Sequence, residues 1–205
     1  MFFIGVDLGK RRDHTAIAVV ERVDGYSPYG QGEMKEMLVR YLERAPLGTS
    51  YTEVAEAVRD AANSAELRGR CSVVVDATGL GGPVVDMLRG AGLGCEVAAV
   101  TITGGEKESQ SGWQWNVPKQ DLIAGVQVLL ERGELRIAED LRETGALVQE
   151  LVDVRMSARG AGRVRLGADG YGEHDDFAIA LALACWCAQR RHGEYGEGTR
   201  RLPGI

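Results

Sequence analysis

Residues 2–20 read FFIGVDLGKRRDHTAIAVV, two short apolar runs on either side of a charged turn. The first run ends at Asp7 and is typical of a buried strand, because aromatic and β-branched side chains fit a pleated surface. The second run follows after a polar turn, which predicts a strand antiparallel to the first. The segment therefore predicts a buried pair of strands with a carboxylate at the end of the first.

The rest of the chain alternates between strand and helix patterns. A third strand is expected around residues 37–42, and a helix over 50–67 with Ser50 or Thr52 as its N-cap. This order predicts an α/β fold with a mixed sheet, antiparallel over its first three strands and parallel later, flanked by helices. The later elements expected are a strand at 71–76, a helix at 83–90, a strand at 95–102, helices at 117–132 and 141–154, a β-hairpin near 152–168, and a last helix at 175–191.

The length and composition are those of one globular domain. A chain of 205 residues with 44% hydrophobic residues can bury a substantial core. No apolar run reaches the ~18 residues that a membrane-spanning helix needs, and the start of the chain does not resemble a signal peptide. We therefore predict a cytoplasmic protein with no membrane partner and a polar, flexible C-terminal tail over residues 193–205.

Charge and cysteine content narrow the function classes. The net charge of -6 argues against a protein that coats nucleic acid by bulk electrostatics, although an enzyme with a local basic surface remains compatible. The four cysteines form no CxxC pair, and the histidines lack zinc-ligand spacing. Buried, reduced thiols are the favoured interpretation.

Four aspartates stand where strands end or the last helix begins: Asp7, Asp76, Asp175 and Asp176. If the first and fourth strands are parallel neighbours, their carboxyl ends meet at one sheet edge, where α/β folds bind ligands. Crowded carboxylates repel unless a cation or shared protons compensate. Oxygen ligands favour Mg²⁺ or Mn²⁺, and two such ions would suit phosphoryl displacement.

Each of these acids also has a local interpretation. Asp7 fits a turn residue, and Asp76 fits a side-chain cap of the turn that follows it. One of the two acids at 175 and 176 fits the N-cap of the last helix, but a helix needs only one cap. From the residues alone, the local roles and the metal site both stay open.

Four blocks, GVDLGKRRDHTAIAVV, VVVDATGLGGPVVDML, VPKQDLIAGVQVLLERGELRIA and GEHDDFAIALALACW, resemble the nuclease domain of the terminase large subunit of tailed bacteriophages. The resemblance implies an RNase H-like fold over residues 1–192. It also implies an endonuclease that uses Mg²⁺ or Mn²⁺, as two ions, to cut concatemeric double-stranded viral DNA during packaging in the cytoplasm of the bacterial host.

The resemblance assigns catalytic and metal-binding roles to the acids. Asp7 matches the ligand of the first strand, Asp76 that of the fourth, and Asp175 or Asp176 that of the last helix; the register between these two stays open. Asp13 matches an acid near the second metal, and equally fits a turn residue.

The resemblance also suggests DNA contacts. The hairpin expected near 152–168 matches an insert close to the active site, where Arg159, Arg163 and Arg165 would hold DNA phosphates. A solvated ribbon is the alternative. Lys119, at the start of a helix, would meet a phosphate there, or is an ordinary surface lysine.

The sequence departs from a full terminase large subunit in one respect. Such a subunit carries an ATPase domain before its nuclease, and this sequence has no GxxxxGK[ST] motif. We therefore expect translocation to lie outside this chain. The resemblance implies that a terminase ATPase domain, a small terminase subunit and a portal are its partners.

Other functions fit parts of the same sequence. A Holliday-junction resolvase or transposase-like nuclease would keep the fold and change the substrate. GVDLG followed by Thr15 also resembles the opening of actin-like phosphotransferases, of which 205 residues would be a fragment. An inactive DNA-packaging adaptor is the non-enzyme alternative, against which the retained acids argue.

Overall fold

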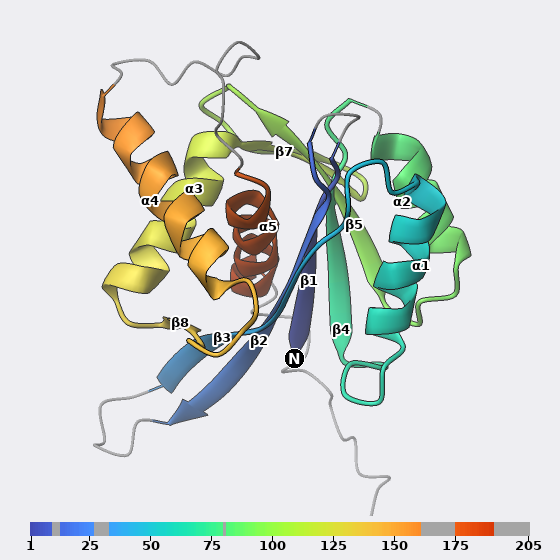
Figure 1. Cartoon of the computed structure of the whole chain (residues 1–205), viewed down its shortest axis with the longest axis horizontal. Helices are drawn as coiled ribbons and strands as arrows, with labels where there is room; N and C mark the ends of the chain where they lie inside the picture. The colour runs from blue at the N-terminus through green and yellow to red at the C-terminus, as the bar shows by residue number, and fades with distance from the viewer. Residues whose placement is uncertain (10–12, 27–32, 80, 161–174, 191–205) are drawn as a thin grey trace, which may run out of the picture.

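A single eight-stranded sheet runs through the computed structural model, in the order β6-β7-β5-β4-β1-β2-β3-β8 (Figure 1). The structure describes residues 1–9, 13–26, 33–79, 81–160 and 175–190. The strands are β1 (Phe2–Asp7), β2 (Ala16–Tyr26), β3 (Glu33–Arg44), β4 (Cys71–Asp76), β5 (Glu96–Thr103), β6 (Ser109–Ser111), β7 (Gln114–Pro118) and β8 (Leu135–Ile137).

The strand directions confirm the predicted mixed sheet. β1, β2 and β3 are successively antiparallel, whereas β4 is parallel to β1 and β5 is parallel to β4. The short strands β6, β7 and β8 were not expected from the sequence. Each has three to five residues, too few to show an alternating pattern.

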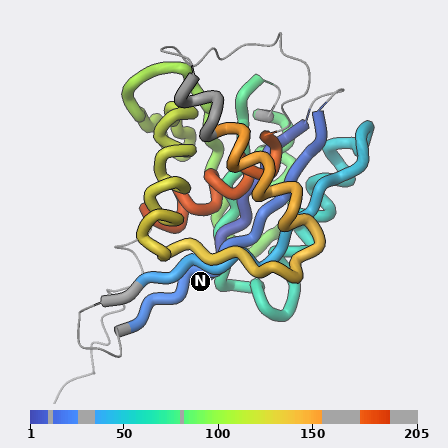
Figure 2. The backbone as a smooth tube through the Cα atoms, turned by 60° about the vertical axis from the view of Figure 1, so that its left-hand side comes forward, coloured from blue at the N-terminus to red at the C-terminus, as the bar shows by residue number. Residues whose placement is uncertain are grey.

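Helices cover both faces of the sheet (Figure 1). On one face lie α1 (Tyr51–Ala62) and α2 (Gly81–Gly90). On the other lie α3 (Lys119–Glu131), α4 (Thr144–Gly160) and α5 (Asp176–Arg190). Ser50 is the N-cap of α1 in a complete capping box with Glu53, as the sequence predicted. Both Figure 1 and Figure 2 show α5 between the sheet and the outer helices α3 and α4, which explains its apolar sequence.

Gly5 allows α5 to lie directly on β1. A Cβ atom at Gly5 would stand 1.9 Å from the carbonyl oxygen of Ala180, so only glycine permits this backbone contact. From Gly5 to Asp7 the strand rises by about 6.6 Å, and from Ala180 back to Asp176 the helix rises by about 6 Å. The contact therefore brings the start of α5 level with the end of β1.

The predicted hairpin near 152–168 is wrong over its first half. α4 continues through residues 152–160 and ends at Gly160. Leu147, Leu151 and Val154 are spaced for one face of a helix, and this spacing outweighs the short alternation further along. Residues 161–168 lie outside the described part of the chain, as does the tail at 193–205. No helix in the described ranges is long and apolar enough to span a bilayer.

Candidate functional site

The carboxyl ends of β1 and β4 form the floor of the candidate site. The two strands are parallel neighbours in which Val6 pairs with Val75, so Asp7 and Asp76 leave the sheet side by side. Both residues end their strands and are partly buried, whereas the residues before them are fully buried. The sheet therefore fixes two carboxylates at one edge.

The start of α5 adds two more carboxylates to this edge. Asp176 is the first residue of α5 and is 6% exposed, and Asp175 precedes it. Burial raises the pKa of Asp7 well above its usual range, and the charges of Asp76, Asp176 and Asp175 raise it further, in that order. Lys119 acts in the opposite direction. The four acids are thus close enough to repel one another.

Thr78 orients the carboxylate of Asp76. The backbone N–H of Thr78 donates to Oδ1 of Asp76 at 2.8 Å, and the Thr78 hydroxyl donates to the same oxygen. The Thr78 hydroxyl in turn accepts from the N–H of Ile102 on β5, at 2.8 Å. The turn-capping role expected for Asp76 is therefore present, and it fixes the direction of the carboxylate at the site.

Lys119 forms an ion pair with Asp175. Lys119 opens α3 directly after β7, and its Nζ contacts Oδ2 of Asp175. Both side chains are about 30% exposed: 28% for Lys119 and 30% for Asp175. Lys119 was expected to meet a DNA phosphate; here its ammonium group stands at the edge of the acid cluster.

Glu150 is a site residue that the sequence analysis missed. Its Oε2 accepts hydrogen bonds from the N–H groups of Phe177 (2.8 Å) and Ala178 (3.0 Å), so a side chain of α4 caps the first turn of α5. Burial raises the pKa of Glu150, although these hydrogen bonds and the nearby Arg44 oppose that shift. The sequence carried one sign of this role: Glu150 stands three residues after Leu147 and therefore lies on the apolar face of α4.

Arg44, the last residue of β3, connects Glu150 to the acid cluster. Its guanidinium forms an ion pair with Oε1 of Glu150, and its Nε lies 3.9 Å from Oδ2 of Asp176. It also lies over the ring of Phe177, 4.3 Å from the centroid. Three elements, β3, α4 and α5, therefore meet around the carboxylate of Asp176.

Asp13 lies apart from this cluster as far as the described contacts show. Its side chain is exposed, and it is not among the charges that shift the pKa of Asp7. Its neighbours shape the turn instead: Nδ1 of His14 lies 2.9 Å from the carbonyl oxygen of Ala45, and the Thr15 hydroxyl accepts from the N–H of Gly9. The described contacts therefore belong to the turn around Asp13, and its role near a second metal stays a prediction.

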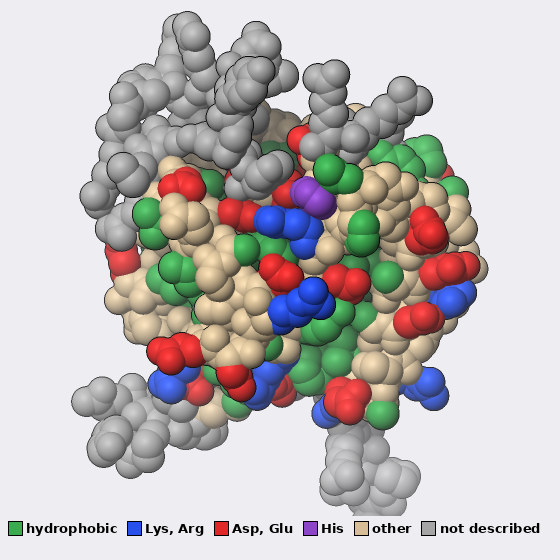
Figure 3. Space-filling model, in the orientation of Figure 1, with side chains coloured by type: hydrophobic (Ala, Val, Ile, Leu, Met, Phe, Trp, Pro, Cys, Tyr) green, Lys and Arg blue, Asp and Glu red, His purple; other side chains and the backbone are tan. Residues whose placement is uncertain are grey.

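The arginines expected to bind DNA fall largely outside the described residues. Arg163 and Arg165 lie there entirely, and only the backbone of Arg159, on α4, is described. On the face seen in Figure 3, acidic and basic side chains are interspersed, and the described residues form no broad basic surface there. This agrees with the negative net charge of the chain.

The donor set fits a hard divalent cation in its chemistry. Carboxylate oxygens are the ligands that Mg²⁺ and Mn²⁺ prefer, and the raised pKa of Asp7 marks a place where added positive charge would be stabilised. Among the described residues, no three acidic, histidine or cysteine side chains already converge at metal-binding distances. One of the four acids, Asp175, is paired with Lys119.

Comparison with solved structures shows which known proteins have a similar fold. No family model and no curated protein matches the sequence. Among solved structures, the Mn-soaked human cytomegalovirus terminase nuclease domain matches with a TM-score of 0.51 and 15% identity, over 93% of this chain and 85% of that one. The Mn-bound nuclease domain of the bacteriophage SPP1 large terminase has 14% identity and a TM-score of 0.46, over 91% and 86% of the two chains. Thermus thermophilus RuvC has 18% identity and a TM-score of 0.38, over 92% and 93%. The predicted resemblance is confirmed at the level of architecture: the chain has the RNase H-like fold of a terminase nuclease domain.

Proposed function

We propose that this chain is a divalent-metal-dependent endonuclease that cuts double-stranded DNA. The observation that carries the proposal is the convergence of Asp7, Asp76, Asp175 and Asp176 at one sheet edge, where burial and then the charges of the other three acids raise the pKa of Asp7. Carboxylates that repel one another are costly to retain unless a cation binds them. The shared fold with a viral terminase nuclease domain that was soaked with Mn supports the same conclusion.

Under this proposal, the position of each residue determines whether it would bind metal or substrate. Asp7 and Asp76 would hold metal from two rigid strands, and Thr78 keeps one Asp76 oxygen directed. Asp176 would complete the ligand set from α5, with Asp175 as a further ligand. The two Mg²⁺ or Mn²⁺ ions that these acids would hold would supply activation of a water and stabilisation of the leaving oxygen of a phosphodiester. Lys119, which pairs with Asp175 beside these acids, would bind a phosphate of the substrate.

The specific biological role proposed here is cleavage of concatemeric viral DNA during packaging, in the cytoplasm of a bacterial host. In that role an ATPase domain, a small terminase subunit and a portal would be the partners. The arginines Arg159, Arg163 and Arg165 would add phosphate contacts; Arg159 lies in the last turn of α4, and the other two stand between α4 and α5 in the sequence. Asp13, exposed on the turn after β1, would contribute only to the periphery of the site.

A plasmid-cleavage assay with Mn²⁺ tests the proposal. Asp7→Asn and Asp76→Asn should each lower cleavage by about three orders of magnitude, because a lost metal ligand removes several kcal/mol of transition-state stabilisation. Asp60→Asn is the matched control, since Asp60 is an exposed acid on α1 that pairs only locally with Arg59. Full activity in both site variants, or activity that survives chelation by EDTA, would refute the proposal. Four-way junctions as a second substrate distinguish a resolvase.

A further inference from the structure

Two cysteines stand side by side at the edge of the sheet opposite to the acid cluster. Cys71 is the first residue of β4, and Cys95 directly precedes β5. The two strands are parallel, and the following residues, Ser72 and Glu96, are register partners. Neighbouring strands lie about 4.8 Å apart, which is inside the range of about 4.4–6.8 Å that disulfides need between Cα atoms.

The two thiols interact with each other and differ in access. Cys71 is 4% exposed, whereas Cys95 is half-buried. A hydrogen bond with the Cys95 side chain lowers the pKa of the Cys71 thiol, against the opposing effect of burial. The Cys71 sulfur also lies 3.7 Å from the carbonyl oxygen of Ala62, to which it can donate.

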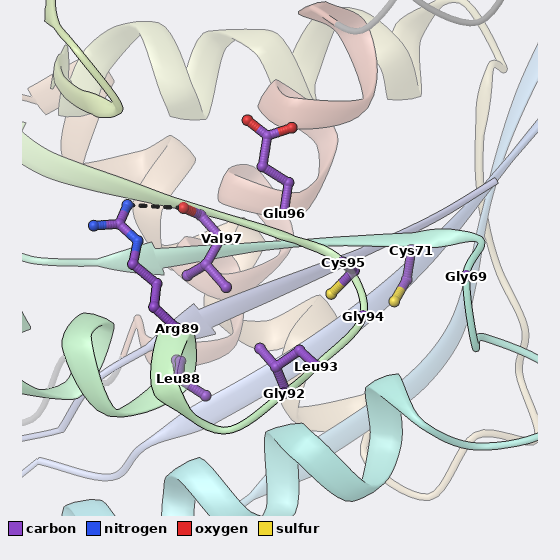
Figure 4. A pocket seen from close by; sticks show the side chains of 10 residues that line it. All are labelled: Gly69, Cys71, Leu88, Arg89, Gly92, Leu93, Gly94, Cys95, Glu96 and Val97. Carbon is purple, nitrogen blue, oxygen red and sulfur yellow. Dashed lines mark hydrogen bonds between the residues drawn. The ribbon is translucent and has the colours of Figure 1, made fainter.

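Both thiols line a cavity of about 470 Å³ (Figure 4). Their sulfur atoms lie on the same side of the strands in that view, and the Glu96 carboxylate points away from them. The apolar wall includes Leu88 and Leu93. On the rim, Arg89 donates to the carbonyl oxygen of Val97 at 2.9 Å. The cavity is therefore large enough for a small molecule to reach the cysteines.

Three glycines line part of this cavity. Gly69, Gly92 and Gly94 have φ angles of +70°, +67° and +62°, a conformation that strongly favours glycine. A Cβ atom at any of them would meet nothing within 4 Å. At these three positions the lining of the cavity is backbone, whereas Leu88 and Leu93 contribute side chains.

We propose that Cys71 and Cys95 form a dithiol site that exchanges with small disulfide molecules. Cys95, the accessible thiol, attacks one sulfur of the small disulfide and forms a mixed disulfide, and the first small thiol leaves. Cys71 then attacks the Cys95 sulfur, the Cys71–Cys95 bond forms, and the second small thiol leaves. The protein loses two electrons and two protons, and the small disulfide gains them.

Cys185 and Cys187 provide an internal comparison. Both are buried in α5 and lie two residues apart on a helix, so their side chains point in different directions. Burial alone raises the pKa of Cys185 to about 12, which makes it a poor nucleophile. We therefore expect the reaction to stay confined to Cys71 and Cys95.

Oxidised glutathione is the probe that tests the site on the full chain. After incubation and denaturation, the free thiol count should fall from four to two, the intact mass should fall by two hydrogens, and peptide mapping should find Cys71 joined to Cys95. Cys71→Ala should instead accumulate a stable glutathione adduct on Cys95, because the resolving thiol is missing. Cys187→Ala is the matched control and should oxidise like the unmodified chain.

Retention of all four thiols in a glutathione buffer that fully oxidises dithiothreitol would overturn the proposal. So would bonds that map to Cys185 or Cys187, or a Cys71→Ala variant without the adduct. Cys95→Ser, at the half-buried position, serves if Cys71→Ala fails to fold. This variant should keep its three remaining thiols free, and loss of any of them would count against the proposal.

Discussion

Asp175 and Asp176 are consecutive in the chain, yet their carboxylates have different surroundings. The Asp175 side chain is 30% exposed and pairs with Lys119, whereas the Asp176 side chain is 8% exposed and lies near Arg44, a residue held by Glu150. Asp176 also raises the pKa of Asp7 more than Asp175 does. The comparison indicates that the start of α5 presents one buried carboxylate, Asp176, and that Asp175, directly before the helix, is partly exposed and paired with a partly exposed lysine.

Neutralising each acid separately is the most direct test of the difference between Asp175 and Asp176. We expect Asp176→Asn to lower Mn²⁺-dependent DNA cleavage by about three orders of magnitude, because it removes the buried ligand. Asp175→Asn should cost only about tenfold to 100-fold, the usual effect of a residue that supports a ligand. Values of kcat/KM for both variants, checked for folding by circular dichroism, measure the difference. Equal losses of activity in the two variants, or a larger loss in Asp175→Asn, would show that Asp176 is not the main ligand and Asp175 not the supporting residue.

Glu150 gives the second-largest test, because it holds the environment of Asp176. Glu150→Ala leaves two N–H groups of α5 and the Arg44 guanidinium without their carboxylate, which should lower the free energy of unfolding by about 3 kcal/mol. For a chain of this size the melting temperature should fall by about 6–12 °C. Mn²⁺ affinity, measured by calorimetry, should fall about 10- to 100-fold.

Two further variants separate positioning by Glu150 from general stability. Glu150→Gln keeps an oxygen for the N–H groups but not the charge that Arg44 needs, so it should recover part of the stability and less of the metal affinity. Asp153→Asn, on the same helix and bonded only to Gln149 in the described contacts, should change neither quantity. A Glu150→Ala protein that melts early but binds Mn²⁺ normally would limit Glu150 to a structural role.

The sequence predicted the architecture because its signals were local. The apolar runs ending at Asp7 and Asp76, the cap at Ser50 and the largely apolar sequence of α5 each predict one element. The prediction that the acids converge depended on one assumption, that β1 and β4 are parallel neighbours. The sheet confirms this assumption.

What the sequence could not supply depended on contacts between distant segments. Arg44 and Glu150 are 106 residues apart, and neither belongs to a motif. Their pairing depends on how α4 packs over α5, which no local pattern records. The hairpin error has the opposite origin: a weak local alternation was outweighed by the helical packing of Leu147 and Leu151.

The pH dependence of stability tests whether burial and the neighbouring acids raise the pKa of Asp7 in the absence of metal. The folded-state pKa of Asp7 is raised above its usual value of 3.8, so the folded protein binds more protons than the unfolded chain above about pH 4. The stability that protonated Asp7 contributes is complete below that pH and is lost as the pH rises through its folded-state pKa. Asp7→Asn removes this loss, so its melting temperature relative to the unmodified chain should increase from pH 4 to pH 8 in EDTA.

Each kcal/mol of stability that Asp7→Asn recovers corresponds to about 2–4 °C in the melting temperature. Glu150, whose pKa is also raised, is present in both proteins and therefore cancels in the difference. Mn²⁺ should reverse the ranking, because it stabilises only the chain that keeps Asp7. A difference that stays constant with pH would contradict a raised pKa of Asp7.

Lys119 gives the smallest test. Among the acids of the cluster, the described contacts pair it with Asp175, and its charge also lowers the pKa of Asp7. Lys119→Met removes an ion pair between partly exposed groups, which should change the free energy of unfolding by less than about 1 kcal/mol. If Asp175 can turn toward the metal once its partner is gone, Mn²⁺ affinity without DNA should rise severalfold, since a competing cation has been removed. DNA affinity should fall in the same variant, because Lys119 is then missing from the phosphate-binding surface. Measured together by calorimetry and filter binding, these opposite changes distinguish an exchangeable Asp175 from one that merely anchors α3 to α5, for which the Mn²⁺ affinity would not change.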